Sequence, residues 1–301
     1  MNKVVLFFLI HFSILNSRAE PFTAAGFTMA DSLVEVSLRY ESVDNLILLP
    51  VTINDTIHVN LILDTGCRNL VLFGKRFTKL FNLHPERQIQ FSGLGAGRPV
   101  EGNLALENKV SIDAVLGNKI PVVVVPNQNL FGLLTKVDGV IGYDIFIKFE
   151  VELIPAQHRI TFRPAFTAEL SSDYEKVPIR VTNSLPVITS TIFLGGKIGQ
   201  IFDLIIDTGS SLGLLVQTSD LEKYPNITRR SVIGRGFNGK ITGASIDADR
   251  LLLHHLEIRS IAASLIYSEF YNHASVGMEI MKDFAVVLNY CKAYAGFKRI
   301  F

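Results

Sequence analysis

Two acidic residues lie inside runs of apolar residues, where an acid is least expected. Asp64 is in LILDTGCRNLVLF, residues 61–73, and Asp207 is in LIIDTGSSLGLLV, residues 204–216. A buried carboxylate without a partner costs several kcal/mol or titrates to its neutral form. Both acids begin the same triplet, Asp-Thr-Gly, so the chain places a carboxylate twice in the same local setting. The pattern predicts two acids that act together.

A pair of neighbouring carboxylates can supply an acid and a base at once. The two groups do not both ionise readily, so they share a proton and titrate as a unit. The ionised member can take a proton from water while the protonated member hydrogen-bonds a substrate carbonyl. Hydrolysis of an amide by this route requires no cofactor. We therefore expect Asp64 and Asp207 to be catalytic, with no metal ligands and no cofactor.

The residues that follow each acid suit two loops that meet. Gly66 and Gly209 allow a tight turn and let backbone N–H groups approach the carboxylates. Thr65 and Thr208 can donate hydroxyl hydrogen bonds that fix one loop against the other. These four residues are predicted to support the pair of acids.

The sequence contains an internal repeat, with one acid in each half. The two triplets are 143 residues apart, and further landmarks recur in the same order at similar offsets. A duplicated chain predicts two lobes about an internal two-fold axis, on which matching residues meet. The matched landmarks are LPVTIND (49–55) and LPVITST (185–191), GLGAGRPVEG (93–102) and GRGFNGKITG (234–243), and VIGYDIFIKFEVEL (140–153) and SVGMEIMKDFAVVL (275–288).

Short apolar runs separated by turn residues indicate a mainly β fold. One predicted hairpin turns at Asn54-Asp55 and its counterpart turns at Gly195-Gly196. The polar stretch before residue 179 contains proline and is typical of a linker. The predicted organisation is a signal peptide over residues 1–19, an N-terminal lobe over 20–165, a linker over 166–178 and a C-terminal lobe over 179–301.

The first residues have the pattern of a secretory signal peptide. Lys3 precedes the apolar run VVLFFLIHFSIL (4–15), and small residues in SRA (17–19) predict cleavage after Ala19. A membrane anchor is the alternative, but this run is too short for a bilayer core about 30 Å thick. We expect an exported protein, periplasmic or secreted, with no integral membrane span.

Charge and spacing argue against several other classes of site. The chain has 29 Lys and Arg against 28 Asp and Glu, without a long basic run, so we expect no nucleic acid partner. GRGFNG (234–239) matches a dinucleotide-binding pattern, but a strand-like sequence follows it where a helix is required. His254 and His255 lack a spaced His or an acidic partner, so we expect no metal there. Cys67 is expected to be a small buried residue rather than half of a disulfide.

These motifs resemble those of the aspartic peptidases of the pepsin and retropepsin superfamily, in a single-chain, two-lobe form. The resemblance covers nearly all of the chain after residue 19, and it includes Val140-Ile141-Gly142 and Ser275-Val276-Gly277. It implies two pseudo-symmetric lobes of the closed β-barrel type with an active-site cleft between them. Gly142 and Gly277 are then the closing elements that thread the loops around each acid.

The resemblance also assigns roles to the residues around the triplets. In this family a hydroxyl after the triplet can bond the neighbouring carboxylate, which fits Ser210, whereas Cys67 departs from the pattern. The glycine-rich stretches lie where retropepsin-like proteins carry flaps over the cleft. The candidate flap and substrate-binding residues are Gly93, Gly95, Gly97, Gly234, Gly236 and Gly239.

The implied function is that of an exported aspartic endopeptidase. Its expected partner is an extended peptide or unfolded protein, because flaps and lobes can pair with a strand-like backbone. We expect a monomer, since the two-fold axis is internal. Because fold does not fix function, an alternative stays open, namely a catalytically silent peptide-binding or envelope-assembly protein on the same scaffold.

Overall fold

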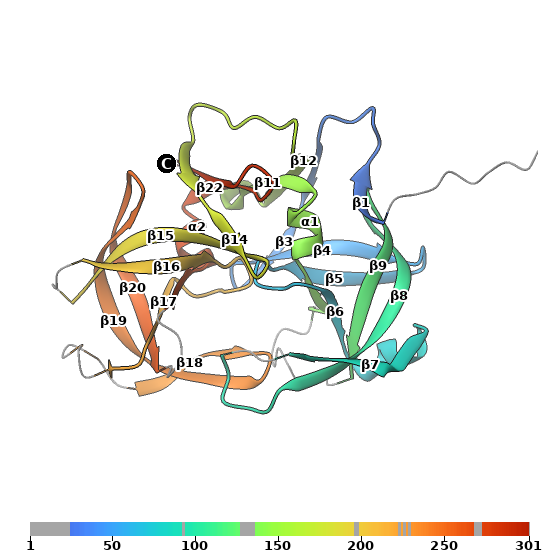
Figure 1. Ribbon diagram of the computed structural model, residues 1–301, viewed down its shortest axis with the longest axis horizontal. Helices are drawn as coiled ribbons and strands as arrows, with labels where there is room; N and C mark the ends of the chain where they lie inside the picture. The colour runs from blue at the N-terminus through green and yellow to red at the C-terminus, as the bar shows by residue number, and fades with distance from the viewer. Residues whose placement is uncertain are drawn as a thin grey trace, which may run out of the picture.

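The computed structural model describes residues 25–91, 94–126, 136–195, 199–221, 224, 227, 230–267 and 273–300. The predicted signal peptide, residues 1–19, lies outside the described residues. The chain is mainly β, as predicted, and Figure 1 shows two lobes side by side below a shared layer of strands.

The helices within the described residues are all short. They are α1 (Tyr143–Phe146) and α2 (Met278–Met281), with 3₁₀ turns η1 (Lys75–Lys79) and η2 (Pro155–Gln157). None of these helices could cross a membrane.

The first lobe is built around a closed β-barrel. Its sheet order, β9-β6-β10-β5-β4-β8, closes because β8 pairs with both β4 and β9. Closure leaves these six strands without a free edge. The barrel strands are β4 (Leu46–Ile53), β5 (Ile57–Leu63), β6 (Leu70–Phe73), β8 (Val100–Ile112), β9 (Val115–Val125) and β10 (Gly139–Ile141), to which β1 (Gly26–Met29), β3 (Glu41–Val43) and β7 (Leu83–Phe91) add at β9, β4 and β8.

The second lobe repeats this barrel strand for strand, which confirms the predicted pseudo-symmetry. Its order, β20-β17-β21-β16-β15-β19, closes through the pairing of β19 with both β15 and β20. The barrel strands are β15 (Leu185–Leu194), β16 (Gln200–Ile206), β17 (Leu214–Thr218), β19 (Gly239–Leu253), β20 (Leu256–Tyr267) and β21 (His273–Val276), to which β14 (Arg180–Thr182) and β18 (Arg230–Gly236) add at β15 and β19.

Tight turns form where the sequence offers residues that tolerate a left-handed backbone. Asn54 and Asp55 have φ angles of 49° and 62° between β4 and β5, as the predicted hairpin requires. Gly195, with a φ of 58°, follows β15 in the matching hairpin. Gly196 lies outside the described residues.

Continuous apolar runs form these strands because both of their faces are covered. On β5, Leu61 and Leu63 face the main core, while Ile62 belongs to a second cluster on the outer face of the barrel. A half-exposed strand would alternate apolar and polar residues, whereas a strand buried on both faces need not. The acid that ends each run is therefore surrounded by apolar packing.

Each lobe also contributes a hairpin to a sheet that joins the two. The six-stranded order is β13-β23-β22-β11-β12-β2, and β11 of the first lobe pairs with β22 of the second, Val151 lying opposite Leu288. The predicted linker, 166–178, ends in β13, at one edge of this sheet. The strands are β2 (Val36–Arg39), β11 (Phe149–Ile154), β12 (Arg159–Pro164), β13 (Glu175–Pro178), β22 (Phe284–Asn289) and β23 (Tyr294–Arg299).

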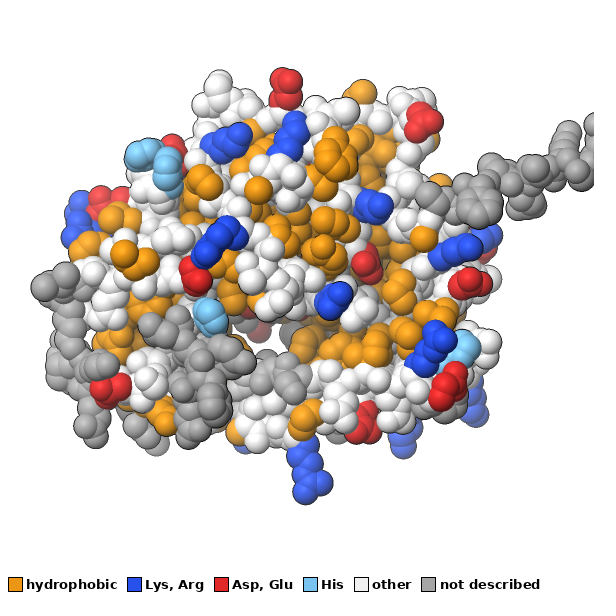
Figure 2. Space-filling view, viewed as in Figure 1, with side chains coloured by type: hydrophobic (Ala, Val, Ile, Leu, Met, Phe, Trp, Pro, Cys, Tyr) orange, Lys and Arg blue, Asp and Glu red, His pale blue; other side chains and the backbone are white. Residues whose placement is uncertain are grey.

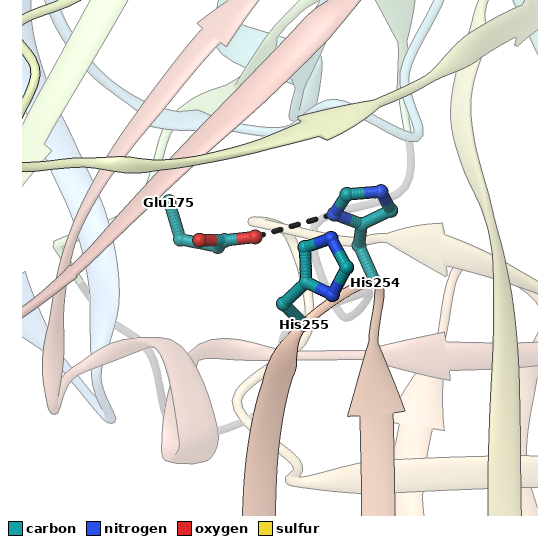
Figure 3. Close-up of side chains that lie close together, drawn as sticks. All are labelled: Glu175, His254 and His255. Carbon is teal, nitrogen blue, oxygen red and sulfur yellow. Dashed lines mark hydrogen bonds and ion pairs between the residues drawn. The ribbon is translucent and has the colours of Figure 1, made fainter.

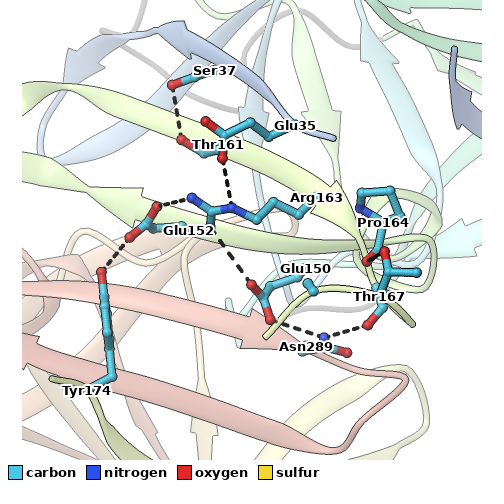
Figure 4. A network of polar contacts seen from close by, with 12 residues as sticks. Glu35, Ser37, Glu150, Glu152, Thr161, Arg163, Pro164, Thr167, Tyr174 and Asn289 are labelled. Atoms are coloured by element: carbon cyan, nitrogen blue, oxygen red, sulfur yellow. Dashed lines mark hydrogen bonds and ion pairs between the residues drawn. The ribbon is translucent and has the colours of Figure 1, made fainter. Parts of the chain in front are cut away.

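A buried charge is held within this inter-lobe sheet (Figure 4). Glu150 is 1% exposed and lies 3.8 Å from the guanidinium of Arg163. It accepts hydrogen bonds from the Asn289 amide, at 3.2 Å, and from the Tyr294 hydroxyl. A buried carboxylate is tolerated only with such partners. Because Asn289 and Tyr294 belong to the second lobe, these bonds also connect the lobes.

Candidate active site

The two acids come from opposite lobes and share one site. Asp64 directly follows β5 and Asp207 directly follows β16. A Cβ atom on Gly209 would lie 2.3 Å from Cγ of Asp64, and one on Gly66 would lie 3.7 Å from Oδ1 of Asp207. Each glycine thus lies against the carboxylate of the other lobe, and a side chain at Gly209 would displace Asp64.

Backbone N–H groups hold each carboxylate in place. Gly66 donates to Oδ1 of Asp64 at 2.7 Å, and Gly209 donates to Oδ1 of Asp207 at 3.0 Å. These bonds stabilise the ionised form of each acid. The predicted supporting role of the two glycines therefore has two parts, because they donate these bonds and leave room for the opposite acid.

The two threonines exchange hydrogen bonds across the lobes. The Thr65 hydroxyl donates to the Ile206 carbonyl at 2.6 Å and accepts from the Thr208 N–H at 3.0 Å. The Thr208 hydroxyl donates to the Leu63 carbonyl at 2.8 Å and accepts from the Thr65 N–H at 3.0 Å. Both residues are fully buried. Each hydroxyl acts as donor and acceptor, so the exchange fixes the relative position of the loops.

The predicted closing elements, which end in Gly142 and Gly277, accept backbone hydrogen bonds from the two acids. The N–H of Asp64 donates to the Ile141 carbonyl at 2.8 Å, and the N–H of Asp207 donates to the Val276 carbonyl at 2.9 Å. A Cβ atom on Gly142 would lie 2.0 Å from the Asp64 carbonyl oxygen. On Gly277 it would lie 2.3 Å from that of Leu212. Only glycine allows these approaches.

The residues after the triplets bond within their own loops. The Cys67 thiol donates to the Asn69 carbonyl at 3.0 Å, and the Ser210 hydroxyl accepts from the Leu212 N–H at 3.3 Å. Cys67 is a free thiol, and burial together with the charge of Asp64 raises its pKa, so it stays protonated. Ser210 therefore supports the loop around Asp207 through the backbone of Leu212.

The environment makes both acids weak. Burial raises the pKa of Asp64, and the negative charge of Asp207 raises it further. Burial also raises the pKa of Asp207, while the Gly209 N–H partly offsets the effect. The pair therefore retains a proton at a pH where an exposed aspartate is ionised, and the two groups titrate together.

Tyr290 is a neighbour of the acids that the motifs did not indicate. Its ring stacks on Phe146 with centroids 5.3 Å apart and contacts Tyr143. Its buried hydroxyl has no hydrogen-bond partner among the described residues. Burial and the charges of Asp64 and Asp207 raise the pKa of the phenol, so it stays neutral.

The two candidate flaps meet each other. Gly95 donates to Oδ1 of Asn238 at 2.7 Å, and the Asn238 amide donates to the carbonyls of Gly95, at 2.7 Å, and Gly97, at 3.3 Å. The Gly97 N–H donates to the Asn238 carbonyl at 2.6 Å. Asn238 is 9% exposed. Its side chain holds the tip of one flap to the tip of the other.

The second flap also reaches the first lobe through Phe237. This ring lies 5.8 Å from that of Phe73 and 6.3 Å from that of Phe91, and it packs against the outer apolar cluster of the first barrel. Motif reading missed both Phe237 and Asn238. A usable signal was present, because Asn238 and Gly95 are separated by 143 residues, as the two acids are.

The flap glycines differ in their surroundings. Gly234 and Gly236 lie in β18, and Gly239 begins β19 with a φ of 112°. GRGFNG thus forms a strand, a turn and a strand rather than the start of a helix. Gly95 and Gly97 lie against Asn238, while Gly93 lies outside the described residues.

We expect Thr208→Ala to destabilise the fold, because it leaves the buried Thr65 N–H and Leu63 carbonyl without partners. The free energy of unfolding should fall by about 2 kcal/mol or more. Thr208→Ser keeps the hydroxyl and should cost about 1 kcal/mol, from the lost methyl group. Urea unfolding of both variants checks this, and equal losses would contradict it.

We expect Asp64→Asn to make stability less dependent on pH. An unfolded aspartate titrates near pKa ~3.9. Above that pH the folded chain, whose acids have raised pKa values, binds more protons than the unfolded chain, so stability falls as pH rises through the folded pKa. The variant should exceed the unsubstituted protein by about 1 kcal/mol or more near pH 8, and by less near pH 4.

Urea unfolding at both pH values measures this difference. Asp31→Asn, at an exposed position, provides the matched control and should leave the pH dependence unchanged. A variant that is equally or less stable near pH 8 would show that burial of the acids carries no such cost.

Comparison with known families agrees with the geometry. A family model described as Aspartyl protease matches residues 49–145, from within β4 to within α1, which include Asp64 and Gly142. No curated protein matched the chain. The second lobe lies beyond the match but repeats its barrel and triplet. The first lobe is therefore similar to this family, and the likeness extends by the repeated barrel and triplet to the second lobe.

Proposed function

We propose that the protein is an exported aspartic endopeptidase that hydrolyses peptide bonds in extended peptides or unfolded proteins. The observation that carries this proposal is the convergence of Asp64 and Asp207, each with a backbone donor and a raised pKa. A scaffold of this family without turnover would not require both acids. Burial of both acids supports a proton shared between them, and the proposed hydrolysis uses this proton.

The pair of acids can divide acid and base roles between its members. The ionised carboxylate takes a proton from a water molecule, whose oxygen attacks the peptide carbonyl carbon. The protonated carboxyl gives its proton to the carbonyl oxygen, so a neutral tetrahedral diol forms and the pair again holds one proton. As the C–N bond breaks, the leaving nitrogen takes that proton from the pair, and a hydroxyl of the diol gives its proton back to the pair. Because the pair titrates as a unit, either acid can hold the starting proton.

The space between the lobes suits an extended substrate. Figure 2 shows the molecule hollowed between its lobes, and Figure 1 shows β7 and β18 across this hollow from β5 and β16. A peptide beneath strand hairpins can form main-chain hydrogen bonds along its length. Figure 2 also shows acidic and basic side chains interspersed on this face, so recognition by backbone and apolar contact fits better than recognition by charge.

We expect Asp64→Asn and Asp207→Asn each to lower kcat at least about a hundredfold, because each removes one of the two acid–base groups. Cleavage of a mixed peptide library, measured from acidic to neutral pH, checks this. Each variant should unfold cooperatively, as the unsubstituted protein does, so that lost activity is not lost fold.

Asp113→Asn, at an exposed turn, is the matched control and should retain full activity. Undiminished cleavage by either acid variant would exclude the proposed mechanism. Absence of cleavage by the unsubstituted, folded protein, with peptide binding retained, would favour the silent binding alternative.

We expect Asn238→Ala to lower KM several-fold, because the flap contacts must break before a peptide can lie beneath them. The apparent affinity for a peptide is proportional to the fraction of molecules whose flaps are open. Weaker contact between the flaps raises that fraction and therefore lowers KM. Hydrogen exchange at residues 94–97 should also become faster, since Gly95 loses its acceptor. Lys240→Ala, which keeps the backbone acceptor for Ala96, is the control. A raised KM would show instead that closure over the substrate dominates.

A further inference from the structure

His254 and His255 form the turn between β19 and β20, and Glu175 begins β13 (Figure 3). The sequence offered no acidic partner for the two histidines. The structure supplies one from the end of the predicted linker, since Nδ1 of His254 lies 3.2 Å from a carboxylate oxygen of Glu175. The expectation that these histidines lack such a partner was therefore wrong.

The turn backbone brings both rings to the same side. Neighbouring residues in a regular strand point to opposite faces. Here His254 has a φ of 57°, and the centroids of the two rings are 3.9 Å apart with their planes inclined by 64°. Without the left-handed residue, the second ring would point away from the first and from Glu175.

The ligand atoms of the three side chains lie close enough together to hold one metal ion. Each side chain offers one ligand atom, and these atoms lie within 4.8 Å of one another. Zn²⁺ binds imidazole nitrogen and carboxylate oxygen at ~2.0–2.2 Å, which places ligand atoms ~3.4 Å apart in a tetrahedron. Small side-chain rotations would close the set, because His254 and Glu175 are 44% and 35% exposed at their side chains.

We propose that Glu175, His254 and His255 bind a divalent transition-metal ion of the Zn²⁺ class, at a site separate from the triplet loops. Two imidazoles and one carboxylate suit Zn²⁺ better than the oxygen-preferring Mg²⁺ or Ca²⁺. A water molecule would complete the coordination. The bound ion joins the β19–β20 turn of the second barrel to the edge strand β13 of the inter-lobe sheet.

This position gives the ion a structural consequence. β13 ends the predicted linker between the lobes, and among the described strands it pairs only with β23. An ion shared by β13 and the β19–β20 turn adds a second attachment for that edge strand. Because the ion binds the folded arrangement of all three ligands, it stabilises the folded state.

Isothermal titration of untagged, chelator-treated protein with zinc chloride tests the proposal. We expect one high-affinity ion per chain near neutral pH, and a rise in Tm of about 2 °C or more at saturating zinc. His254→Ala and Glu175→Gln should each weaken binding at least about tenfold and abolish the Tm shift.

His84→Ala is the matched control, because His84 pairs with Glu86 at 3.0 Å without a second histidine. This variant should bind zinc as the unsubstituted protein does. In the presence of chelator, the Tm of each variant should equal that of the unsubstituted protein, which shows that the substitution does not disturb the fold. If one variant has a lower Tm in chelator, His255→Ala is tested in its place. Unchanged binding in the site variants, or no binding by the unsubstituted protein, would overturn the proposal.

Discussion

The exchange of hydrogen bonds between Thr65 and Thr208 is the constraint on which the site depends. Each hydroxyl is fully buried and must serve as donor and acceptor, so neither loop can shift without leaving polar groups unpaired. Because each threonine directly follows an acid, fixing the loops also fixes the carboxylates. The glycine that follows Thr208 must lack a side chain, since a Cβ atom on Gly209 would occupy the place of the Asp64 carboxylate. Three adjacent residues, used twice, thus specify where the two carboxyl groups meet.

The internal two-fold axis is followed closely at the centre and loosely at the periphery. The acids, threonines and glycines match in type and in contacts. Away from them the pairs diverge, since Gly95 of one flap meets Asn238 of the other, and Phe237 packs on the first lobe. A symmetric pair of flaps would present two equivalent tips, whereas here one flap carries the side chain that holds both. The two flaps therefore occupy matching positions, but the side chain that joins them comes from one flap.

Sequence reasoning found what depends on local pattern. Buried strands, the turn at Asn54-Asp55, the triplets and the repeat all follow from the type and spacing of nearby residues. It missed contacts that arise when distant elements meet. The bond between Asn238 and Gly95 depends on how two hairpins bend toward each other, and the partner of His254 depends on where β13 joins the inter-lobe sheet. Neither contact can be predicted from the periodicity of residues in the sequence.

The same topology braces the two acids and places the candidate flaps at the ends of their sheets. Each triplet loop is braced by its own barrel through the carbonyls of Ile141 and Val276 and by the other barrel through the threonines. The candidate flaps differ, because among the described strands β7 pairs only with β8 and β18 only with β19, at the ends of their sheets. Separating the flap tips breaks the few contacts of Asn238 and Phe237 and leaves both closed barrels intact. The barrels thus maintain the burial that raises the pKa values of the acids, whereas the candidate flaps lie at the sheet edges, outside both barrels.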